Sequence, residues 1–280
     1  MLFPLALTSP LPWLSLCAMS ARVVHRKDAR TGAGAEEVSF GYKLVSAPEK
    51  KRLVSGQFDP IARRYDLGDA LLSFGLHFYW KGWGIDQLAL KEGERVLDVC
   101  GGTGDLAVLA AVRVAPLGRA FVYDFNRPMM QAGRAKVIRF RFAGSILFVE
   151  GNAESLSFPD AIFDAVTVGF GIRNLVYLDA GLSEMHRVLK PGGRLMILEF
   201  ALPVHRWLRR LYDVYSFKVM PLAAGIICGT AGPFRYLAES IRVFDAPERV
   251  AERLKNSGFS DVRFQRLTDG IAVVYMARKY

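Results

Sequence analysis

Short apolar runs alternate with helical patterns along most of the chain from residue 50 onward. The stretches Asp105–Val114, Pro128–Phe140 and Ala180–Leu189 repeat apolar residues at helical spacing. Between such stretches lie five runs typical of buried strands: Arg95–Val99, Ala120–Tyr123, Ile146–Val149, Ala165–Val168 and Arg194–Phe200. Strands that alternate with helices predict βαβ units, and therefore an α/β fold with a doubly wound, mostly parallel sheet.

Further helical patterns flank this alternating region. Residues 46–90 are expected to form N-terminal helices, one over Ala47–Tyr65 and one over Ala70–Gln87. Residues 202–245 are helical in pattern and rich in aromatic residues, which we interpret as an insertion that covers a substrate site. Near the C-terminus, Asp269-Gly270 separates two apolar runs. An Asp-Gly pair is a strong hairpin signal, so we expect an antiparallel strand at one edge of the sheet.

The first 45 residues are expected to form a poorly ordered extension, which leaves residues 46–280 as the folded domain. Residues 1–21 carry no charge, and residues 22–36 are polar and rich in Arg and Ala. No positively charged segment precedes the apolar stretch, as a signal peptide requires. Three prolines interrupt the same stretch, namely Pro4, Pro10 and Pro12, so a membrane-spanning helix is not favoured either.

The composition indicates a protein with a large core. Of the 280 residues, 51% are hydrophobic and 23% are charged, which excludes a disordered, collagen-like or coiled-coil chain. Three cysteines (Cys17, Cys100 and Cys228) are odd in number and widely separated. This spacing argues against a disulfide framework and against a zinc site, so we expect a reducing compartment and no bound metal.

The net charge is +10, from 37 Lys and Arg against 27 Asp and Glu. No zinc-finger spacing or RNA-binding signature accompanies the basic residues, so we expect most of them on solvated helix faces and no nucleic-acid partner. Some are expected to meet an anionic membrane surface. We therefore expect a cytoplasmic protein with peripheral contact to the inner membrane surface, and a homo-oligomer remains open.

A glycine-rich turn follows the first predicted strand and precedes a helix. Gly101, Gly102 and Gly104 would let the backbone approach a ligand and would leave helix N-terminal amides free to bind it. The pattern Gly102-x-Gly104-x-x-Ala107 satisfies the dinucleotide fingerprint, which permits Ala at its third position. Asp124 ends the second strand about 20 residues later, where a carboxylate can accept ribose hydroxyls. Both a nicotinamide dinucleotide and an adenosyl cofactor fit these features.

Two further motifs separate the two cofactors. Gly151-Asn152-Ala153-Glu154 follows the third strand, where an adenine edge could meet an amide side chain, and Leu189 to Gly193 forms a rigid turn before the fifth strand. Together with Asp98 in the strand before the glycine turn, these motifs resemble the Rossmann-like S-adenosylmethionine-dependent methyltransferases. Cys100 stands where the usual glycine motif has its first Gly.

A closer resemblance is to the ubiquinone/menaquinone biosynthesis C-methyltransferase family. Tyr65–Trp80 resembles the first signature of that family, and Arg187–Glu199 resembles the second. The stretches Gly169–Asn174 and Arg235–Ile241 also agree, and the resemblance extends from about Lys50 to the C-terminus. The chain departs from the pattern at three places: Gly68-Asp69 replaces the usual Met-Asn, Ala201 replaces a Ser, and Gly169 stands where some members carry Ser.

The resemblance implies a reaction and a cofactor. The family uses S-adenosylmethionine to methylate a ring carbon of a polyprenylated hydroquinol. We favour demethylmenaquinol as the substrate, with a demethylated ubiquinol precursor as the alternative. The predicted cofactor-binding residues are Asp98, Gly101, Thr103, Asp124, Asn152, Ala153 and Gly169. Alternatives from other classes are a nicotinamide-dependent oxidoreductase and a non-catalytic subunit of a quinone-synthesis complex.

Methylation of a ring carbon requires that a neighbouring hydroxyl loses its proton. Arg173 is the predicted stabiliser of the phenolate, because a guanidinium stays protonated at neutral pH; a salt-bridged structural Arg is the alternative. His77 is the candidate base because its ordinary pKa lies near working pH, although a lone His on an aromatic helix is more often structural. Tyr65 is the third candidate, as a group that orients a water or the ring hydroxyl.

Overall fold

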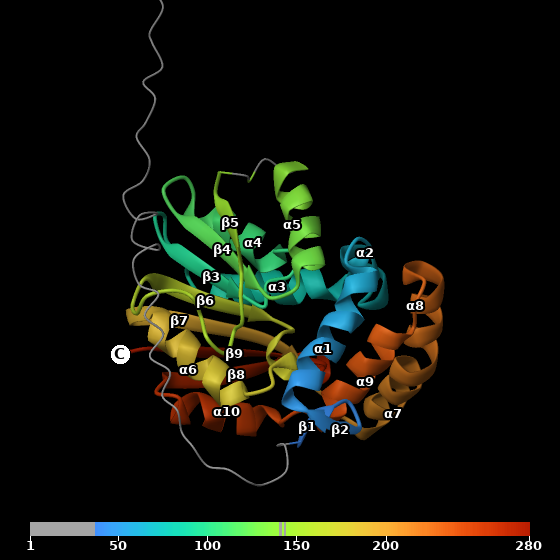
Figure 1. Ribbon diagram of the computed structural model, residues 1–280. Coiled ribbons are helices and arrows are strands. Elements are labelled where there is room, and N and C mark those ends of the chain that lie inside the picture. Colours follow the sequence, from blue (N-terminus) through green and yellow to red (C-terminus); the bar gives the residue numbers. More distant parts are fainter. Residues whose placement is uncertain (1–36, 140–141, 143) are drawn as a thin grey trace, which may run out of the picture. The chain divides into compact units, whose positions relative to one another are not determined.

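The seven strands of the main sheet lie in the order β5-β4-β3-β6-β7-β9-β8 (Figure 1). This computed structural model describes residues 37–139, 142 and 144–280. The strands are β3 (Arg95–Val99), β4 (Arg119–Asp124), β5 (Ile146–Glu150), β6 (Phe163–Gly169), β7 (Leu189–Phe200), β8 (Ser260–Leu267) and β9 (Ala272–Arg278). The first five are parallel to one another. The edge strand β8 pairs antiparallel with β9, which is also antiparallel to β7. The predicted fold class is confirmed.

Helices cover both faces of the sheet because alternate strand residues point to opposite sides. On one face, Leu97 and Val99 pack in the same cluster as residues of α6 (Leu178–Val188) and α10 (Pro247–Asn256). On the other face, Val96 packs in a cluster with residues of α3 (Leu76–Gln87), α4 (Asp105–Val114) and α5 (Arg127–Arg139). The strands are therefore buried on both sides, which explains their nearly continuous apolar sequences.

The N-terminal helices are shorter than predicted. The chain forms α1 (Ala47–Phe58), a 3₁₀ turn (Asp59–Ile61) and α2 (Tyr65–Leu72) before α3. Pro60 lies in the 3₁₀ turn, where its ring cannot continue the α-helical hydrogen bonds of α1. Gly75 separates α2 from α3 with a φ of 73°, a left-handed conformation that ends a helix.

The predicted start of the folded domain at residue 46 is wrong for residues 37–45. These residues form the hairpin of β1 (Glu37–Phe40) and β2 (Lys43–Ser46). The hairpin packs on α9 (Gly232–Val243), where the Phe40 ring stacks on Tyr236 with 4.3 Å between ring centroids. A short hairpin gains its order from this distant aromatic partner, which local sequence does not reveal. The rest of the predicted extension lies outside the described residues.

Residues 202–245 form the predicted helical layer. It consists of α7 (Arg206–Val214), a π-helical turn (Tyr215–Val219), α8 (Met220–Cys228) and α9. With α2 and the 3₁₀ turn after α1, these helices bury an apolar cluster separate from the sheet core. In Figure 1 this layer lies on the right, beside α1 and α2. The layer therefore forms a wall next to the carboxyl ends of the central strands.

Candidate active site

The glycine-rich turn lies between β3 and α4, at the carboxyl end of the sheet. Gly102 and Gly104 have φ angles of 52° and 81°, which favour glycine. A Cβ at Gly101 would lie 2.8 Å from a carboxylate oxygen of Asp98, so that position has no room for a side chain. Cys100 also has a left-handed φ of 54°, which costs a non-glycine residue about 1–2 kcal/mol. Cys100, which replaces the first Gly of the usual motif, thus has a strained backbone conformation.

Asp124 is fixed beside this turn by backbone hydrogen bonds. Its Oδ2 accepts the N–H of Gly102 and its Oδ1 accepts the N–H of Asn126, both at 2.8 Å. Each carboxylate oxygen keeps a further lone pair for another donor. Burial raises the pKa of Asp124 to about 6. The carboxylate is therefore preorganised to accept two hydroxyl groups of a bound ligand.

The predicted cofactor residues surround two connected pockets. The first has about 770 Å³ of empty space, including its open mouth, and is lined by Asp98, Gly101, Thr103, Asp124 and Gly169. The second lies beyond Asp124 and is lined by Asn152 and Ala153. Both pockets share Asp124, Val54, Cys100, Phe125, Asn174 and Leu175. The structure thus brings all seven predicted cofactor residues to one continuous cavity, here called the cofactor pocket.

Helix α1 covers the cofactor pocket through Val54, Phe58 and Lys51. Three polar contacts fix the helix in place. The Lys50 ammonium donates to the Leu175 carbonyl at 2.7 Å, Lys51 pairs with Glu154 at 3.2 Å, and the Asn126 side-chain amide donates to Asp59 at 2.6 Å. Sequence reasoning predicted the helix but not its place over the cofactor, because that place depends on contacts between distant segments.

Asp98 lies in strand β3, directly before the glycine turn. Its Oδ1 accepts the Thr167 hydroxyl at 2.9 Å, and burial raises the pKa of Asp98 to about 7. Thr103 has another partner set, since its hydroxyl donates to Asp66 at 2.6 Å and accepts from Lys136 at 3.0 Å. Both side chains therefore position the glycine turn through hydrogen bonds within the protein.

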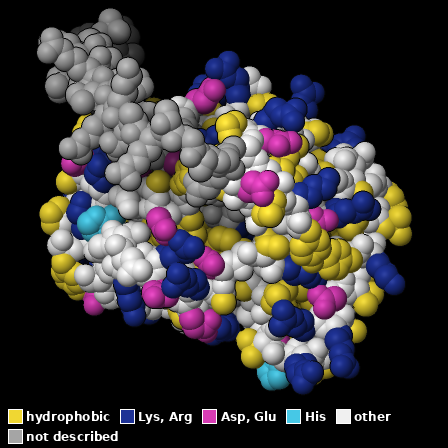
Figure 2. All heavy atoms as spheres, turned by 60° about the horizontal axis from the view of Figure 1, so that its bottom comes forward, with side chains coloured by type: hydrophobic (Ala, Val, Ile, Leu, Met, Phe, Trp, Pro, Cys, Tyr) yellow, Lys and Arg dark blue, Asp and Glu magenta, His cyan; other side chains and the backbone are white. Residues whose placement is uncertain are grey.

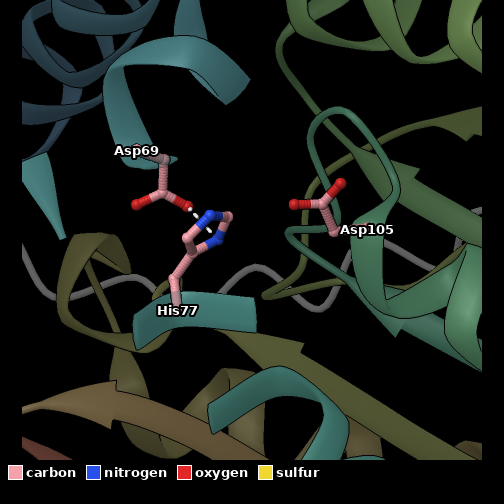
Figure 3. A group of neighbouring side chains, drawn as sticks. All are labelled: Asp69, His77 and Asp105. Atoms are coloured by element: carbon pink, nitrogen blue, oxygen red, sulfur yellow. Dashed lines mark ion pairs between the residues drawn. The ribbon is translucent and has the colours of Figure 1, made fainter. Parts of the chain in front are cut away.

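Next to the turn, Asp69, His77 and Asp105 surround the ammonium group of Lys81. Figure 3 shows the three side chains converging from α2, α3 and the start of α4. Such a group could in principle hold a metal ion. Here the Lys81 Nζ lies 2.9 Å from Asp69, 2.9 Å from His77 Nδ1 and 2.8 Å from Asp105. Burial favours the neutral amine, but the two carboxylates outweigh it and raise the pKa of Lys81.

His77 lies in this cluster and not at the cavity wall. It is fully buried, its Nδ1 is 3.0 Å from Asp69, and its Nε2 has no hydrogen-bond partner among the described residues. Tyr65, in contrast, lines the cofactor pocket. Burial and the nearby Asp69 raise the pKa of Tyr65. Of these two candidates, only Tyr65 faces the space in which a reaction can occur.

Arg173 forms a buried ion pair with Glu199. Its Nη1 lies 2.7 Å from the Glu199 carboxylate and also donates to the Phe170 carbonyl, while its Nε has no partner among the described residues. Arg173 lines neither pocket, although the next residue, Asn174, lines both. The salt-bridged alternative of the sequence analysis thus describes its geometry, and its catalytic role stays a prediction.

A second, largely apolar cavity of about 900 Å³ lies between α2, α3 and the helices α7–α9. Its lining includes Phe74, Trp80, Phe200, Leu211 and Tyr212, together with the carboxylate-bearing Asp69. Burial raises the pKa of Tyr212 to about 12, which keeps its hydroxyl protonated at neutral pH. We call this space the apolar cavity.

Sequence reasoning gave no role to the charged residues that form ion pairs in and beside these cavities. They are Asp69, Lys81, Asp105, Lys136 and Glu199. A signal existed for Lys81, which follows His77 by four residues and so lies on the same helix face. The partners on other elements carry no such local signal.

Comparison with known proteins shows the family to which the chain belongs. Residues 45–279 match the profile of the ubiE/COQ5 methyltransferase family. The chain belongs to this family. It is 42% identical over 241 residues to the ubiquinone/menaquinone biosynthesis C-methyltransferase UbiE of Shewanella sp. (strain ANA-3), which covers 86% of this chain and 96% of that protein. A relative from Shewanella pealeana is 40% identical over the same shares.

Solved methyltransferase structures share the fold of this ubiE/COQ5 member. An S-adenosylmethionine-dependent methyltransferase from Thermotoga maritima aligns with a TM-score of 0.56 at 18% identity, covering 80% of this chain and 99% of that chain. One from Aquifex aeolicus aligns with a TM-score of 0.52 at 16% identity, covering 84% and 100%. The ubiE/COQ5 member is therefore an S-adenosylmethionine-dependent C-methyltransferase, and the oxidoreductase alternative is excluded.

The cofactor pocket fits S-adenosylmethionine. Gly101 and Gly102 leave space that a Cβ would reduce, the two oxygens of Asp124 can accept hydroxyl groups, and Asn152 and Ala153 border the end of the pocket beyond it.

Proposed function

We propose that this ubiE/COQ5 methyltransferase methylates a ring carbon of a polyprenylated hydroquinol, with demethylmenaquinol as its acceptor. A demethylated ubiquinol precursor is the alternative acceptor. The relatives named above are ubiquinone/menaquinone biosynthesis C-methyltransferases, which supports a quinol. The choice between the two rings rests on the aromatic residues of the site.

One observation carries the proposal: the ion pair of Lys81 and Asp69 connects the cofactor pocket with the apolar cavity. Lys81 lines the cofactor pocket, and Asp69, 2.9 Å from its ammonium group, lines the apolar cavity. A polar head near this pair would have the cofactor on one side and an apolar wall on the other. This arrangement suits a molecule with a reactive ring and a hydrocarbon tail.

Aromatic side chains between the two cavities favour the larger ring. Phe170 of the cofactor pocket stacks on Phe200 of the apolar cavity, with 4.1 Å between centroids, and Trp80 packs edge-on against both. Stacking and edge-to-face contacts grow with the aromatic area of the partner. The two fused rings of a naphthoquinol offer more such area than a benzoquinol.

The chemistry assigns separate tasks to the residues. When bound, S-adenosylmethionine supplies an electrophilic methyl group. Asp124 and the glycine turn hold the cofactor in place beside the acceptor, which contributes through proximity and orientation. Tyr65 orients the acceptor hydroxyl, whose proton passes to water at the open mouth of the pocket, and the positive charge of Arg173 stabilises the phenolate that remains. Burial raises the pKa of Tyr65 and the positive charge of Arg173 partly offsets this rise, so the charge reaches the pocket although the side chain does not line it.

The test is a direct comparison of acceptors. Purified protein is incubated with methyl-labelled S-adenosylmethionine and either demethylmenaquinol or a demethylated ubiquinol precursor with the same isoprenoid tail, both kept reduced. We expect label in the ring of the naphthoquinol product and a lower kcat/KM with the benzoquinol. Equal or higher kcat/KM with the benzoquinol would reverse the assignment of the ring, and no label in either product would refute the function.

A further inference from the structure

The helical stretch Arg206–Cys228 has an exposed apolar side. By length and composition this stretch could cross a membrane. However, Ser216, Met220, Ala224 and Cys228 recur every four residues and are buried, with α8 packed on α2 and α9. On the outer side, the Leu222 and Ile226 side chains are 71% and 80% exposed. One side of the stretch is thus packed against the protein, and the other side is exposed to solvent.

A second row of exposed apolar residues lies on the neighbouring helices α2 and α3. Leu67, Leu71, Phe74 and Phe78 follow each other at intervals of three or four residues and are all exposed, Phe74 at 77%. The Phe74 ring lies 5.8 Å from that of Tyr215, whose hydroxyl donates to the Leu72 carbonyl. This contact joins the two rows. We call the surface formed by both rows the docking face.

Exposed cations lie along the same helical stretch, Arg206–Cys228. Arg206, Arg209, Arg210 and Lys218 are exposed, and none of them has an ion-pair partner among the described residues. The acidic residue of the same stretch, Asp213, is engaged by Arg242. On the right of Figure 2, which is the side of α2 and α7–α9 in Figure 1, apolar side chains lie among Lys and Arg side chains.

The apolar cavity reaches the docking face. Phe74, Leu76 and Leu211 line the cavity and are also exposed to solvent. A chain of hydrocarbon that entered between them would pass from the outside into the cavity without crossing a polar layer. The exposed apolar surface and the entrance of the cavity therefore coincide.

We propose that the docking face binds the surface of an anionic lipid bilayer, with α7–α8 lying in the headgroup region and the entrance of the apolar cavity turned toward the acyl chains. Exposed apolar residues beside basic ones are the pattern of helices that lie in a membrane interface. The role of the entrance as the route for the acceptor tail rests on the proposed function, whereas the binding of lipid does not.

The charges favour a bilayer over a second copy of the chain. In a two-fold dimer through this face, the four cations would meet the same four cations of the other subunit or lie close to them. An anionic leaflet instead attracts each of them, which raises the affinity about fivefold for every basic residue near the headgroups. The bilayer is therefore the occupant that satisfies both the apolar and the charged residues.

The experiment is vesicle co-sedimentation without quinone. Wild-type protein is mixed with vesicles of phosphatidylcholine alone or with one third phosphatidylglycerol, at low and at physiological salt. We expect binding to the anionic vesicles that weakens with salt. The variant L222E/I226E should lose it, and R209Q/R210Q should weaken it about 25-fold, as two basic residues at fivefold each. Neither variant changes a residue of the two cavities.

Matched controls carry the same changes elsewhere. L117E/I138E replaces two apolar residues that are also exposed, and K91Q/K255Q removes two exposed cations from other elements. Both controls should bind vesicles as the wild type does. Equal losses in the controls and the docking-face variants, or wild-type binding to uncharged vesicles alone, would overturn the proposal. The proposal would also be overturned if the wild type is a dimer, L222E/I226E is a monomer, and neither protein binds vesicles.

An activity measurement separates this proposal from the proposed function. With a water-soluble, tail-less quinol, the docking-face variants should keep the wild-type kcat, and with a long-tailed quinol in anionic vesicles they should lose at least tenfold in rate. If no quinol is methylated while the wild type still binds anionic vesicles and L222E/I226E does not, the function fails and the docking face stands. If the variants match the wild type on the vesicle substrate, the docking face is wrong.

Discussion

Arg173 and Glu199 form an ion pair that the fold buries completely, with 2.7 Å between Nη1 and Oε1. Glu199 is the last residue but one of strand β7, and it also accepts the backbone N–H groups of Arg173 and Phe200. Removal of one partner from a buried pair leaves an uncompensated charge, which destabilises a protein by about 3–5 kcal/mol. A substitution of Arg173 therefore changes stability as well as any catalytic contribution.

The first prediction separates these two effects. Arg173→Met should lower kcat by about 10²–10³, the loss typical of one transition-state donor, and should also lower the free energy of unfolding. In the double variant R173M/E199Q, stability should return because no unpaired carboxylate remains, while kcat should stay low. The measurements are kcat and denaturant unfolding of both variants. A double variant that regains the wild-type kcat would show that Arg173 acts only through the fold.

The second prediction concerns the pH dependence that Asp124 confers. Its pKa is raised from 3.8 to about 6 by burial, so between these values the folded protein holds a proton that the unfolded chain has released. This contribution to stability is present below pH 4 and is lost as the pH rises through about 6, amounting to about 3 kcal/mol. Asp124→Asn should abolish that part of the decline. Melting temperatures of both proteins at pH 4.5 and 7 test it.

The same carboxylate predicts how cofactor affinity responds to pH. Ionised Asp124 is the form that accepts two hydroxyl groups, so the affinity for S-adenosylmethionine should increase as the pH rises through about 6 and then level off. Asp124→Asn should weaken binding at least tenfold at pH 7.5 and remove this dependence. Calorimetric titration gives both values, and an unchanged affinity of the variant would remove Asp124 from the site.

The third prediction uses the Lys81 cluster. Lys81→Met should destabilise the protein by about 3–5 kcal/mol, because Asp69 then loses the cation that holds its pKa below the ordinary value. The added change Asp69→Asn should recover much of this loss, since it removes the unpaired carboxylate. Urea unfolding at pH 7.5 compares the two variants. The prediction is wrong if the double variant unfolds as early as Lys81→Met.

The fourth prediction concerns the N-terminal hairpin. A chain that begins at Ala47 lacks the Phe40 ring that stacks on Tyr236, an interaction of about 0.5–1.5 kcal/mol beyond its buried area. Its melting temperature should therefore be lower than that of a chain that begins at Glu37. The expected difference is about 2–4 °C for each kcal/mol of unfolding free energy that is lost. Phe40→Ala in the longer chain should reproduce most of the difference. Identical melting curves of all three would show that the hairpin contributes nothing.

The sequence alone predicted those parts of the fold that depend on local patterns. The strands β3–β6 agree with their predicted runs to within two residues at either end, because strands buried on both faces are continuously apolar and end at glycines or acidic residues. The cofactor residues were predicted for the same reason, since the glycine turn and Asp124 follow directly from the strand ends.

Other features depend on distant partners and could not be predicted in this way. The hairpin at Phe40 requires Tyr236, almost two hundred residues away, and the helix over Ala47–Tyr65 breaks at Pro60 although its apolar pattern continues. Arg173 was predicted to lie beside the acceptor ring, but its partner Glu199 comes from strand β7 and holds it behind the cavity wall. Charge pairs between elements leave no periodic signal in a sequence.

Because α1 covers the cofactor pocket, its position affects how spent cofactor is exchanged for S-adenosylmethionine. The helix is held by the polar contacts of Lys50, Lys51 and Asp59 and by the packing of Val54 and Phe58. Transient lifting of α1 would break these contacts and also those that α1 makes with α9. We expect spent cofactor to exchange with the aqueous phase by this route. The acceptor would instead arrive from the lipid bilayer. The rate of turnover would then depend on how often α1 opens.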